Sequence, residues 1–387
     1  MRRMKILYHV TPEADASPIY HEMVAQLALC MQDRAEVDVP AARDGYVVQS
    51  LEGYDMVHVF GCWNMGAARL LAKAYQDHVP TVYSPLGGLQ PWVVKRRKSF
   101  FTISSQRNMT RKALAVHVCG KLERETFLSL KLNNRVSLIK NPVLTAKTSF
   151  PEMASLMFSL YQKVCDTYAR LLLGATSCQA IGELLALGID ETLLREDKVR
   201  IDNMRNFVSE LNASDWRKIY IYATDERIME PLQVGLGRLQ MPAPACDVDA
   251  IDRFAHDAHY AQGTLLSNKL LSRNPLIKSK LNDVMEPNEG KEKDIIVRLF
   301  NLKYELEHRQ APLAHLADVY QAIRFTDADE DRLNEVARSM GILDFSQRLM
   351  AVLRETLGLT EGFMPFKAKD DKVAKTMTKD ITKFNSY

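Results

Sequence analysis

Few residues in this chain have the type and spacing that chemistry requires, and most of them follow short apolar runs. Gly87 and Gly88 stand together after one such run, where the lack of side chains would let backbone N–H groups approach a substrate oxygen or a phosphate. The pair is equally typical of a plain turn. Trp92 could form a wall of a binding cleft, or it could pack in the core.

Nucleophilic catalysis finds little support in the sequence. Ser84 has no evident partner that could activate it. We expect His117 and Cys119 to point to opposite faces of their strand, which would prevent them from forming a nucleophile–base pair. The nucleophile-elbow, phosphate-loop and zinc-protease motifs do not occur.

Metal and thiol chemistry are equally weakly indicated. His256 and His259 are spaced i, i+3, but no third ligand has suitable spacing, so we expect surface histidines and no metal site. The six cysteines are scattered and include no Cys-x-x-Cys pair, which indicates free, mostly buried thiols in a reducing compartment. No resident cofactor is expected.

One segment of the chain is strongly basic. Residues 95–112 carry seven cations and no acidic residue, and aromatic side chains interleave with the cations. This pattern is typical of a surface that contacts anionic lipid, although a solvated helix face is the competing interpretation. Nucleic-acid binding is poorly supported, because the net charge of the chain is only +3. The predicted membrane-contact residues are Lys95, Arg96, Arg97, Lys98, Phe100 and Phe101.

Length and composition indicate a globular protein of two or three domains. The chain has 387 residues, of which 47% are apolar and 26% charged, and these values exclude a disordered chain, a fibre or a disulfide scaffold. No apolar run is long enough for a membrane span, and the first residues do not have the pattern of a signal peptide. We therefore expect a cytoplasmic protein, with peripheral attachment to the inner membrane face if the basic segment binds lipid.

The first half of the chain alternates short apolar runs with helical patterns. Strands are predicted at residues 5–10, 35–39, 55–60, 80–84, 115–119 and 136–139, and helices at residues 19–31, 67–75 and after residue 119. Such alternation is the signature of a parallel sheet with helices on both faces. The sequence therefore predicts a Rossmann-like doubly wound domain over residues 1–148.

Beyond Pro151 helical spacing takes over, so the predicted fold class is α/β plus all-α. Helices are expected at residues 153–173, 178–187, 197–211, 216–226, 231–239, 295–306, 312–323, 329–340 and 346–357. The short run Ile219–Tyr222 could instead be a strand. Within this mainly helical domain of residues 149–387, we expect a loose region at 241–288 and fraying of the last 22 residues, which carry six lysines.

Four stretches of the first half resemble the amino-terminal, acceptor-binding domain of family-4 glycosyltransferases, enzymes of the two-Rossmann GT-B architecture. They are Asp55–Asn64, Pro80–Trp92, Ala115–Glu123 and Val136–Val143. They resemble the family's D-V-V-H-x-H run, its P-x-V-x-S-P-x-G-M-L-x-P-W loop, its A-D-x-V-H-x-T-S-x-x-E strand and its V-x-V-I-P-N-G-V strand. The order and spacing of the four agree with the family, and the resemblance covers about residues 4–144.

The resemblance implies a glycosyltransferase-like protein of glycan or cell-envelope polysaccharide synthesis. Its acceptor would be a glycan or a lipid-linked glycan, and its donor a nucleotide sugar if it is active. The motifs end predicted parallel strands, where open α/β sheets bind ligands. His58 and Glu123 are the two candidates for a catalytic base. The implied substrate-binding residues are Gly61, Trp63, Ser84, Gly87, Gly88, Trp92 and Asn141.

The sequence departs from the family where the donor would bind. The loop after the first strand has no glycine and carries Glu13 and Asp15, which would repel a diphosphate. Leu86 stands where some members have a functional histidine or arginine. No second set of alternating strands follows Pro151, and Glu361–Pro365 echoes the family's E-G-F-G-x-P without its context.

Two functions of different classes therefore stay open. The chain is either a nucleotide-sugar-dependent glycosyltransferase or a non-catalytic, degenerate scaffold. The scaffold would bind a glycan, a membrane surface or a partner protein through its helical half.

Overall fold

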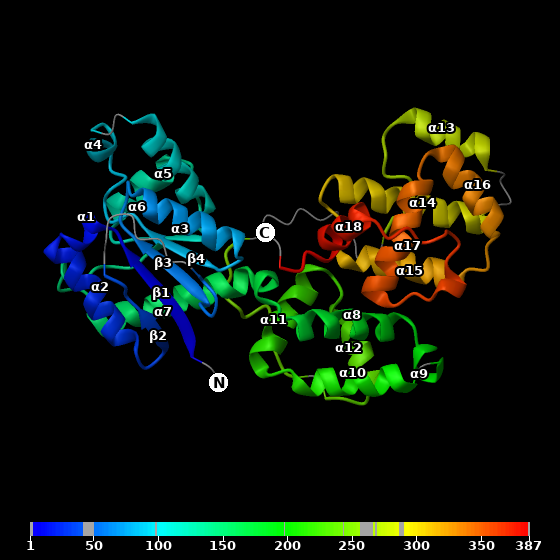
Figure 1. The fold of residues 1–387 in the computed structure, drawn as a ribbon, viewed down its shortest axis with the longest axis horizontal. Coiled ribbons are helices and arrows are strands. Elements are labelled where there is room, and N and C mark those ends of the chain that lie inside the picture. Colours follow the sequence, from blue (N-terminus) through cyan, green and yellow to red (C-terminus); the bar gives the residue numbers. More distant parts are fainter. Residues whose placement is uncertain are drawn as a thin grey trace. The chain divides into compact units, whose positions relative to one another are not determined.

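The computed structural model describes residues 3–41, 50–96, 99–196, 198–242, 244–255, 266–267, 269–285 and 290–385 (Figure 1). The chain divides into two compact units. The amino-terminal unit comprises Met1–Leu171 together with Ile251–His256, and the carboxyl-terminal unit comprises Leu172–Ala250 together with Asp257–Ser386. No helix in the described part of the chain is both long and apolar enough to cross a bilayer.

The amino-terminal unit contains a six-stranded parallel sheet in the order β2-β1-β3-β4-β5-β6. This sheet confirms the predicted Rossmann-like fold, and the predicted strand positions agree to within one residue at most ends. The strands are β1 (Met4–Val10), β2 (Ala35–Asp38), β3 (Met56–Phe60), β4 (Thr81–Ser84), β5 (Ala115–Val118) and β6 (Val136–Leu138).

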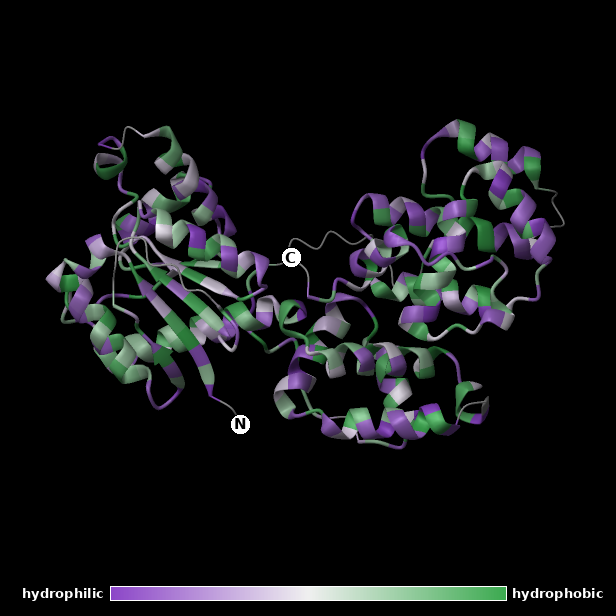
Figure 2. Ribbon diagram, viewed as in Figure 1, coloured by the Kyte–Doolittle hydropathy of each residue, from purple (hydrophilic) through white to green (hydrophobic). Residues whose placement is uncertain are grey.

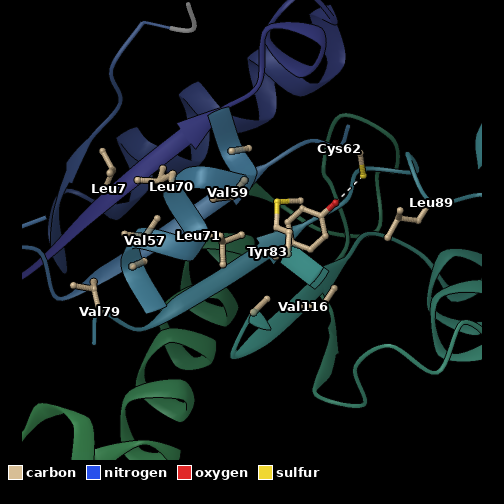
Figure 3. Packing of buried hydrophobic residues seen from close by; sticks show 14 of the residues in the cluster. Leu7, Val57, Val59, Cys62, Leu70, Leu71, Val79, Tyr83, Leu89 and Val116 are labelled. Atoms are coloured by element: carbon tan, nitrogen blue, oxygen red, sulfur yellow. Dashed lines mark hydrogen bonds between the residues drawn. The ribbon is translucent and has the colours of Figure 1, made fainter. Parts of the chain in front are cut away.

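One face of the sheet packs against α3 (Met65–Gln76) and α5 (Phe100–Lys112). Figure 3 shows Val57, Val59 and Tyr83 on this face, with Leu70 and Leu71 of α3 among them. Val57 and Val59 are both fully buried and share the face because strand residues two apart point the same way. The apolar alternation of β3 therefore supplies one core layer.

The other face lies against α2 (Pro18–Met31) and α7 (Phe150–Thr167), which contact each other. Because α7 packs with the sheet, the amino-terminal unit extends to Leu171, beyond residue 148, where the sequence pattern changes. Part of the region expected to be loose also joins this unit. The Phe254 N–H donates to Thr167 Oγ1 over 2.9 Å, and Lys163 Nζ lies 2.7 Å from Asp252 Oδ1.

Three short helices connect the strands at the carboxyl edge of the sheet. They are α1 (Pro12–Asp15) after β1, α4 (Pro91–Val94) after β4 and α6 (Lys121–Ser129) after β5. Each follows its strand directly or after a short loop, so the segments that lead into them collect at one edge. This edge is where open α/β sheets bind ligands.

The described part of the carboxyl-terminal unit contains helices and no strand, which confirms the predicted fold class. Figure 2 shows hydrophobic and hydrophilic residues mixed along these helices, as expected when each buries one face. Ile219–Tyr222, for which a strand was the alternative, lies within α11. The helices are α8 (Ala175–Ile189), α9 (Leu193–Glu196), α10 (Lys198–Glu210), α11 (Ala213–Asp225), α12 (Met229–Arg238), α13 (Pro275–Val284), α14 (Gly290–Glu307), α15 (Leu313–Phe325), α16 (Glu330–Met340), α17 (Leu343–Leu357) and α18 (Lys372–Thr382), with a 3-10 turn at Glu361–Phe363. A second 3-10 turn, Ala169–Leu172, lies at the boundary between the two units.

The stretch predicted to be loose, residues 241–288, forms no helix or strand at the described residues 244–255 and 269–274 but contains α13, which Asn274 caps by accepting the Leu276 N–H over 3.0 Å. The predicted fraying of the last residues was wrong. The end of the chain forms α18 rather than fraying, because its apolar residues find a buried partner surface. Ile381 is fully buried there, and the Tyr222 hydroxyl donates to the Thr382 carbonyl oxygen over 2.5 Å.

Lys383 fixes the end of α18 through an ion pair with Glu226, whose side chain is only 2% exposed. Lys383 Nζ lies 2.7 Å from Glu226 Oε2 and also donates to the Ala311 carbonyl oxygen over 2.8 Å. Glu226 accepts the Leu313 N–H as well, over 2.9 Å. This cluster ties the end of the chain to the α11–α12 turn and to the start of α15.

We expect Lys383→Met to destabilise the carboxyl-terminal unit by about 3 kcal/mol, because it leaves the Glu226 carboxylate buried without its cation. Lys375→Met on the exposed side of α18 is the matched control and should change stability by less than about 0.5 kcal/mol. Urea unfolding followed by hydrogen exchange in peptides of α11 and α15 measures both. Equal effects of the two substitutions would contradict a structural role for the pair.

Candidate functional site

The loops that follow β3 and β4 contain an unusual backbone. Trp63 has φ +64° and Leu86 has φ +50°, a left-handed conformation that side-chain-bearing residues rarely adopt. Gly61 at +106° and Gly87 at +76° are left-handed too. Strained residues of this kind persist only where their surroundings hold them, and they gather at ligand sites and switches. The carboxyl edge of β3 and β4 is therefore the candidate functional site.

The two loops are locked to each other. Trp63 Nε1 donates to the Gly88 carbonyl oxygen over 2.7 Å, and the Trp63 N–H donates to Gln106 Oε1 over 2.7 Å. A Cβ atom on Gly88 would lie 2.7 Å from Cys62 Sγ, so only glycine allows this approach. Of the predicted substrate-binding residues, Trp63 and Gly88 therefore hold the edge of the sheet together.

Glu123 joins this edge to the next strand. Its Oε1 accepts the Gly87 N–H over 2.6 Å, and its Oε2 accepts the Cys119 N–H over 2.8 Å. The Gly87 N–H is thus bonded to Glu123 and does not face a ligand. Burial raises the pKa of the Glu123 carboxyl group, and the two N–H donors oppose that shift.

A second predicted set of residues forms a hydrogen-bonded chain beneath the sheet, on the face that carries α7. His58 Nε2 lies 2.7 Å from Ser84 Oγ, and Ser84 Oγ lies 2.7 Å from His117 Nδ1. On the other side, His58 Nδ1 lies 2.7 Å from the Tyr161 hydroxyl, which is 3.0 Å from the Tyr8 hydroxyl. All five side chains are fully buried. The sequence showed no partner for Ser84, yet the structure gives it two.

The Ile139 carbonyl group determines which atoms of this hydrogen-bonded chain donate and which accept. His117 Nε2 lies 2.9 Å from the Ile139 carbonyl oxygen, which can only accept, so Nε2 carries the proton. In a neutral ring His117 Nδ1 then accepts from the Ser84 hydroxyl. The Ser84 oxygen is left to accept from His58 Nε2, and His58 Nδ1 accepts from Tyr161. One carbonyl group therefore fixes both tautomers as long as both rings are neutral.

Burial keeps both rings neutral. Desolvation lowers the pKa of His117 to about 4, although the hydrogen bond to the Ile139 carbonyl oxygen opposes the shift. Desolvation, and then the neighbouring His117, lower the pKa of His58 well below its usual value. Both ring nitrogens of His58 are already bonded. Its catalytic role stays a prediction, and so does that of Glu123.

The expectation that His117 and Cys119 lie on opposite faces was wrong, because residues two apart in a strand share a face. Cys119 Sγ lies 3.9 Å from His117 Nε2. That nitrogen carries a proton and directs it to the Ile139 carbonyl oxygen, so it does not act as a base for the thiol. Burial and Glu123 also raise the pKa of the Cys119 thiol well above its usual value.

Three buried polar atoms near the carboxyl ends of strands have no hydrogen-bond partner among the described residues. They are His9 Nε2 near the end of β1, Gln90 Oε1 in the loop after β4 and Asn141 Nδ2 just after β6. Their residues are 6%, 6% and 1% exposed. Leaving such a group unpaired costs about 1–3 kcal/mol, so each calls for a water or a ligand. Sequence patterns cannot reveal them, because they depend on which partners the fold withholds.

The predicted membrane-contact residues lie partly within the described chain. Phe100 and Phe101 are 76% and 81% exposed, and Lys95 and Arg96 are exposed as well. Trp92, predicted as a binding residue, is 56% exposed and so does not pack in the core. The remaining members of the basic run, residues 97 and 98, and the histidine pair at 256 and 259 lie outside the described residues. Within the described ranges, no three His, Cys, Asp or Glu side chains converge as metal ligands.

Comparisons of this chain with models of protein families, with curated proteins and with solved structures each gave no match. The Rossmann-like sheet and the helical region after it are confirmed by the topology. The resemblance of residues 4–144 to family-4 glycosyltransferases stays a prediction from the four motifs.

The buried histidines predict a loss of stability in acid. Their pKa values are lowered in the folded state, so the unfolded chain binds protons first as the pH falls below about 6.5. Stability should therefore fall between pH 6.5 and about 4, the folded pKa of His117, by at most about 1.4 kcal/mol per pH unit for each histidine.

Urea unfolding at several pH values measures this loss. In a Trp216→Phe background, the remaining tryptophans report on the amino-terminal unit alone. His117→Gln retains an amide that can donate to the Ile139 carbonyl oxygen but does not titrate, so it should flatten the slope. A stability that is constant or rises from pH 6.5 to pH 4 would show that the chain of histidines is not neutral.

Proposed function

We propose that this protein is glycosyltransferase-like and binds a glycan or a lipid-linked glycan at the carboxyl edge of its amino-terminal sheet. The observation that carries the proposal is the set of unpaired atoms on His9, Gln90 and Asn141. The Asn141 Nδ2 group donates and the Gln90 Oε1 atom accepts, while a ring nitrogen does either. Sugar hydroxyl groups also donate and accept, so a hydroxyl-rich ligand suits this mixed set.

The surroundings of these atoms support the same ligand class. Trp92 lies two residues after Gln90 and exposes more than half of its surface. Flat aromatic side chains with a few placed polar groups are a common lining of small-molecule sites. Gln90 follows directly on the loop that the Trp63–Gly88 hydrogen bond holds in place. The four motifs that resemble family-4 glycosyltransferases end at the same edge.

A second candidate, a non-catalytic glycan-binding scaffold, is favoured by how the residues around the donor position are used. Both oxygens of Glu123 accept backbone N–H groups, and both nitrogens of His58 are bonded. In the loop after β1, the Asp15 N–H donates to the Thr11 carbonyl oxygen over 2.9 Å rather than facing a phosphate. Glu13 and Asp15 add negative charge at that position. These contacts support glycan binding without sugar transfer.

An anionic membrane surface is a further proposed partner. Phe100 and Phe101 expose most of their surface, and Lys95 and Arg96 are exposed as well. Exposed aromatic rings with cations around them favour insertion at the headgroup level of a bilayer. A lipid-linked acceptor would be met at such a surface. Flotation with anionic vesicles measures this contact.

Glycan binding should depend on Trp92. We expect Trp92→Ala to weaken binding to immobilised oligosaccharides by about tenfold, because the exposed indole supplies stacking area. Leu122→Ala removes an equally exposed apolar side chain from α6 and should leave binding unchanged. A glycan panel to which the unmodified protein does not bind, or a panel on which both variants behave alike, would remove the proposal.

Nucleotide sugars decide between the two candidates. We expect uridine and guanosine diphosphate sugars to give no thermal shift, because Glu13 and Asp15 repel a diphosphate and the loop N–H groups are used internally. A bound donor at 100 times its dissociation constant would stabilise the fold by about 2.7 kcal/mol. Such a stabilisation would restore the transferase and exclude the scaffold.

A further inference from the structure

A hollow of about 400 Å³ lies along the outer side of α5. Figure 1 shows α5 beside α3 and α4 in the amino-terminal unit. The volume falls in the range of small-ligand sites. The side chains that line the hollow all come from α5, and they include two guanidinium groups, two hydroxyl groups, an amide and two apolar walls. They are Phe100, Ile103, Ser104, Ser105, Arg107, Asn108 and Arg111.

The inner side of α5 holds this hollow in place. Met109 is 2% exposed and packs in the sheet core. Gln106 Nε2 donates to the Tyr83 hydroxyl over 2.9 Å and to Thr110 Oγ1 over 3.2 Å. Because the buried face is fixed by packing and hydrogen bonds, the outer face presents its side chains from a rigid element. Rigid presentation lowers the entropy cost of binding.

Arg107 and Arg111 stand four residues apart, so they are neighbours on the helix surface, where like charges destabilise. Elsewhere the chain pairs such cations with acids. Lys73 lies 2.9 Å from Asp77, and Arg298 lies 2.7 Å from Asp294. Residues 95–112 contain no acid, and no ion pair of either arginine occurs among the described residues. The two guanidinium groups therefore repel each other in a hollow that an anion could fill.

We propose that this hollow binds a phosphate group. Two guanidinium groups provide planar forks for bidentate hydrogen bonds to phosphate oxygens. The Ser104 hydroxyl and the Asn108 amide add neutral donors. Phe100 and Ile103 give the hollow an apolar end, which suits a phosphate carried on a lipid as well as a free phosphate compound.

The helix dipole explains only part of the arrangement of cations on α5. Cations in the last turn of a helix are stabilised by the helix dipole, and this accounts for Arg111 and Lys112. It does not account for Arg107, which lies in the middle of α5, nor for the hollow between the two arginines. The proposal does not rest on glycan binding, because Trp92 and the unpaired buried atoms are not part of the hollow.

The experiment uses the full chain, with Arg107→Gln and Arg111→Gln combined. The matched control combines Lys121→Gln and Arg124→Gln, which remove the same charge from exposed positions on α6. One arm measures thermal shift with inorganic phosphate against sodium chloride of equal ionic strength. The other measures flotation with phosphatidylcholine vesicles that contain phosphatidic acid or phosphatidylglycerol at matched surface charge.

We expect the arginine variant to lose the response to phosphate or to weaken binding to phosphatidic acid vesicles about 30-fold, the loss of two cations at a lipid surface. The control should keep most of the binding, and Arg107→Lys with Arg111→Lys should recover only part of it. A response to vesicles alone assigns the phosphate to a lipid headgroup, and a response to phosphate alone assigns it to a soluble compound. Equal losses in the two glutamine variants, or no binding by the unmodified chain in either arm, would overturn the proposal.

Discussion

A carbonyl group can only accept hydrogen bonds, and the one at Ile139 sets the order of the buried interior around it. Because it takes the proton of His117 Nε2, every further donor and acceptor along Ser84, His58 and Tyr161 follows while the rings are neutral. The chain of hydrogen bonds, which ends at Tyr8, links four strands of the sheet with α7. In a low-dielectric interior an unpaired member of such a chain would be costly, whereas a fully paired chain specifies one arrangement. Through Tyr161, this buried chain is one of the contacts that attach α7 to the sheet.

At the carboxyl edge of the sheet, polar side chains are likewise hydrogen-bonded within the protein. Side chains that look catalytic in the sequence, such as His58 and Glu123, have their polar atoms bonded to the protein itself. The buried polar atoms without a partner at this edge belong instead to His9, Gln90 and Asn141. Amide groups can bind hydroxyl-rich molecules but do not exchange a proton near neutral pH. For this reason we propose recognition rather than sugar transfer at this edge.

Periodicity was sufficient to predict the elements, but contacts between elements needed the fold. The strands of the amino-terminal half were predictable because buried parallel strands are short and apolar. The partners of Ser84 were not, since they depend on how β3, β4 and β5 align, and a sequence does not state its register. The lysines at the end of the chain suggested fraying, while Asp371 was a usable signal of the opposite, because it caps α18 by accepting the Ala374 N–H over 2.9 Å. The prediction of fraying rested on the lysine content of this segment and overlooked its capping aspartate.

Gln106 connects α5, which carries the hollow, to the candidate edge of the sheet. Its Oε1 accepts the N–H of Trp63, the residue with a left-handed backbone after β3. Its Nε2 donates to the hydroxyl group of Tyr83, which lies on the face of the sheet that α3 and α5 cover. Arg107 is the next residue on the helix and faces outward. The side chain that holds the Trp63 loop and a side chain that lines the hollow therefore come from neighbouring residues of one helix. An ordered α5 is thus a requirement of both proposals.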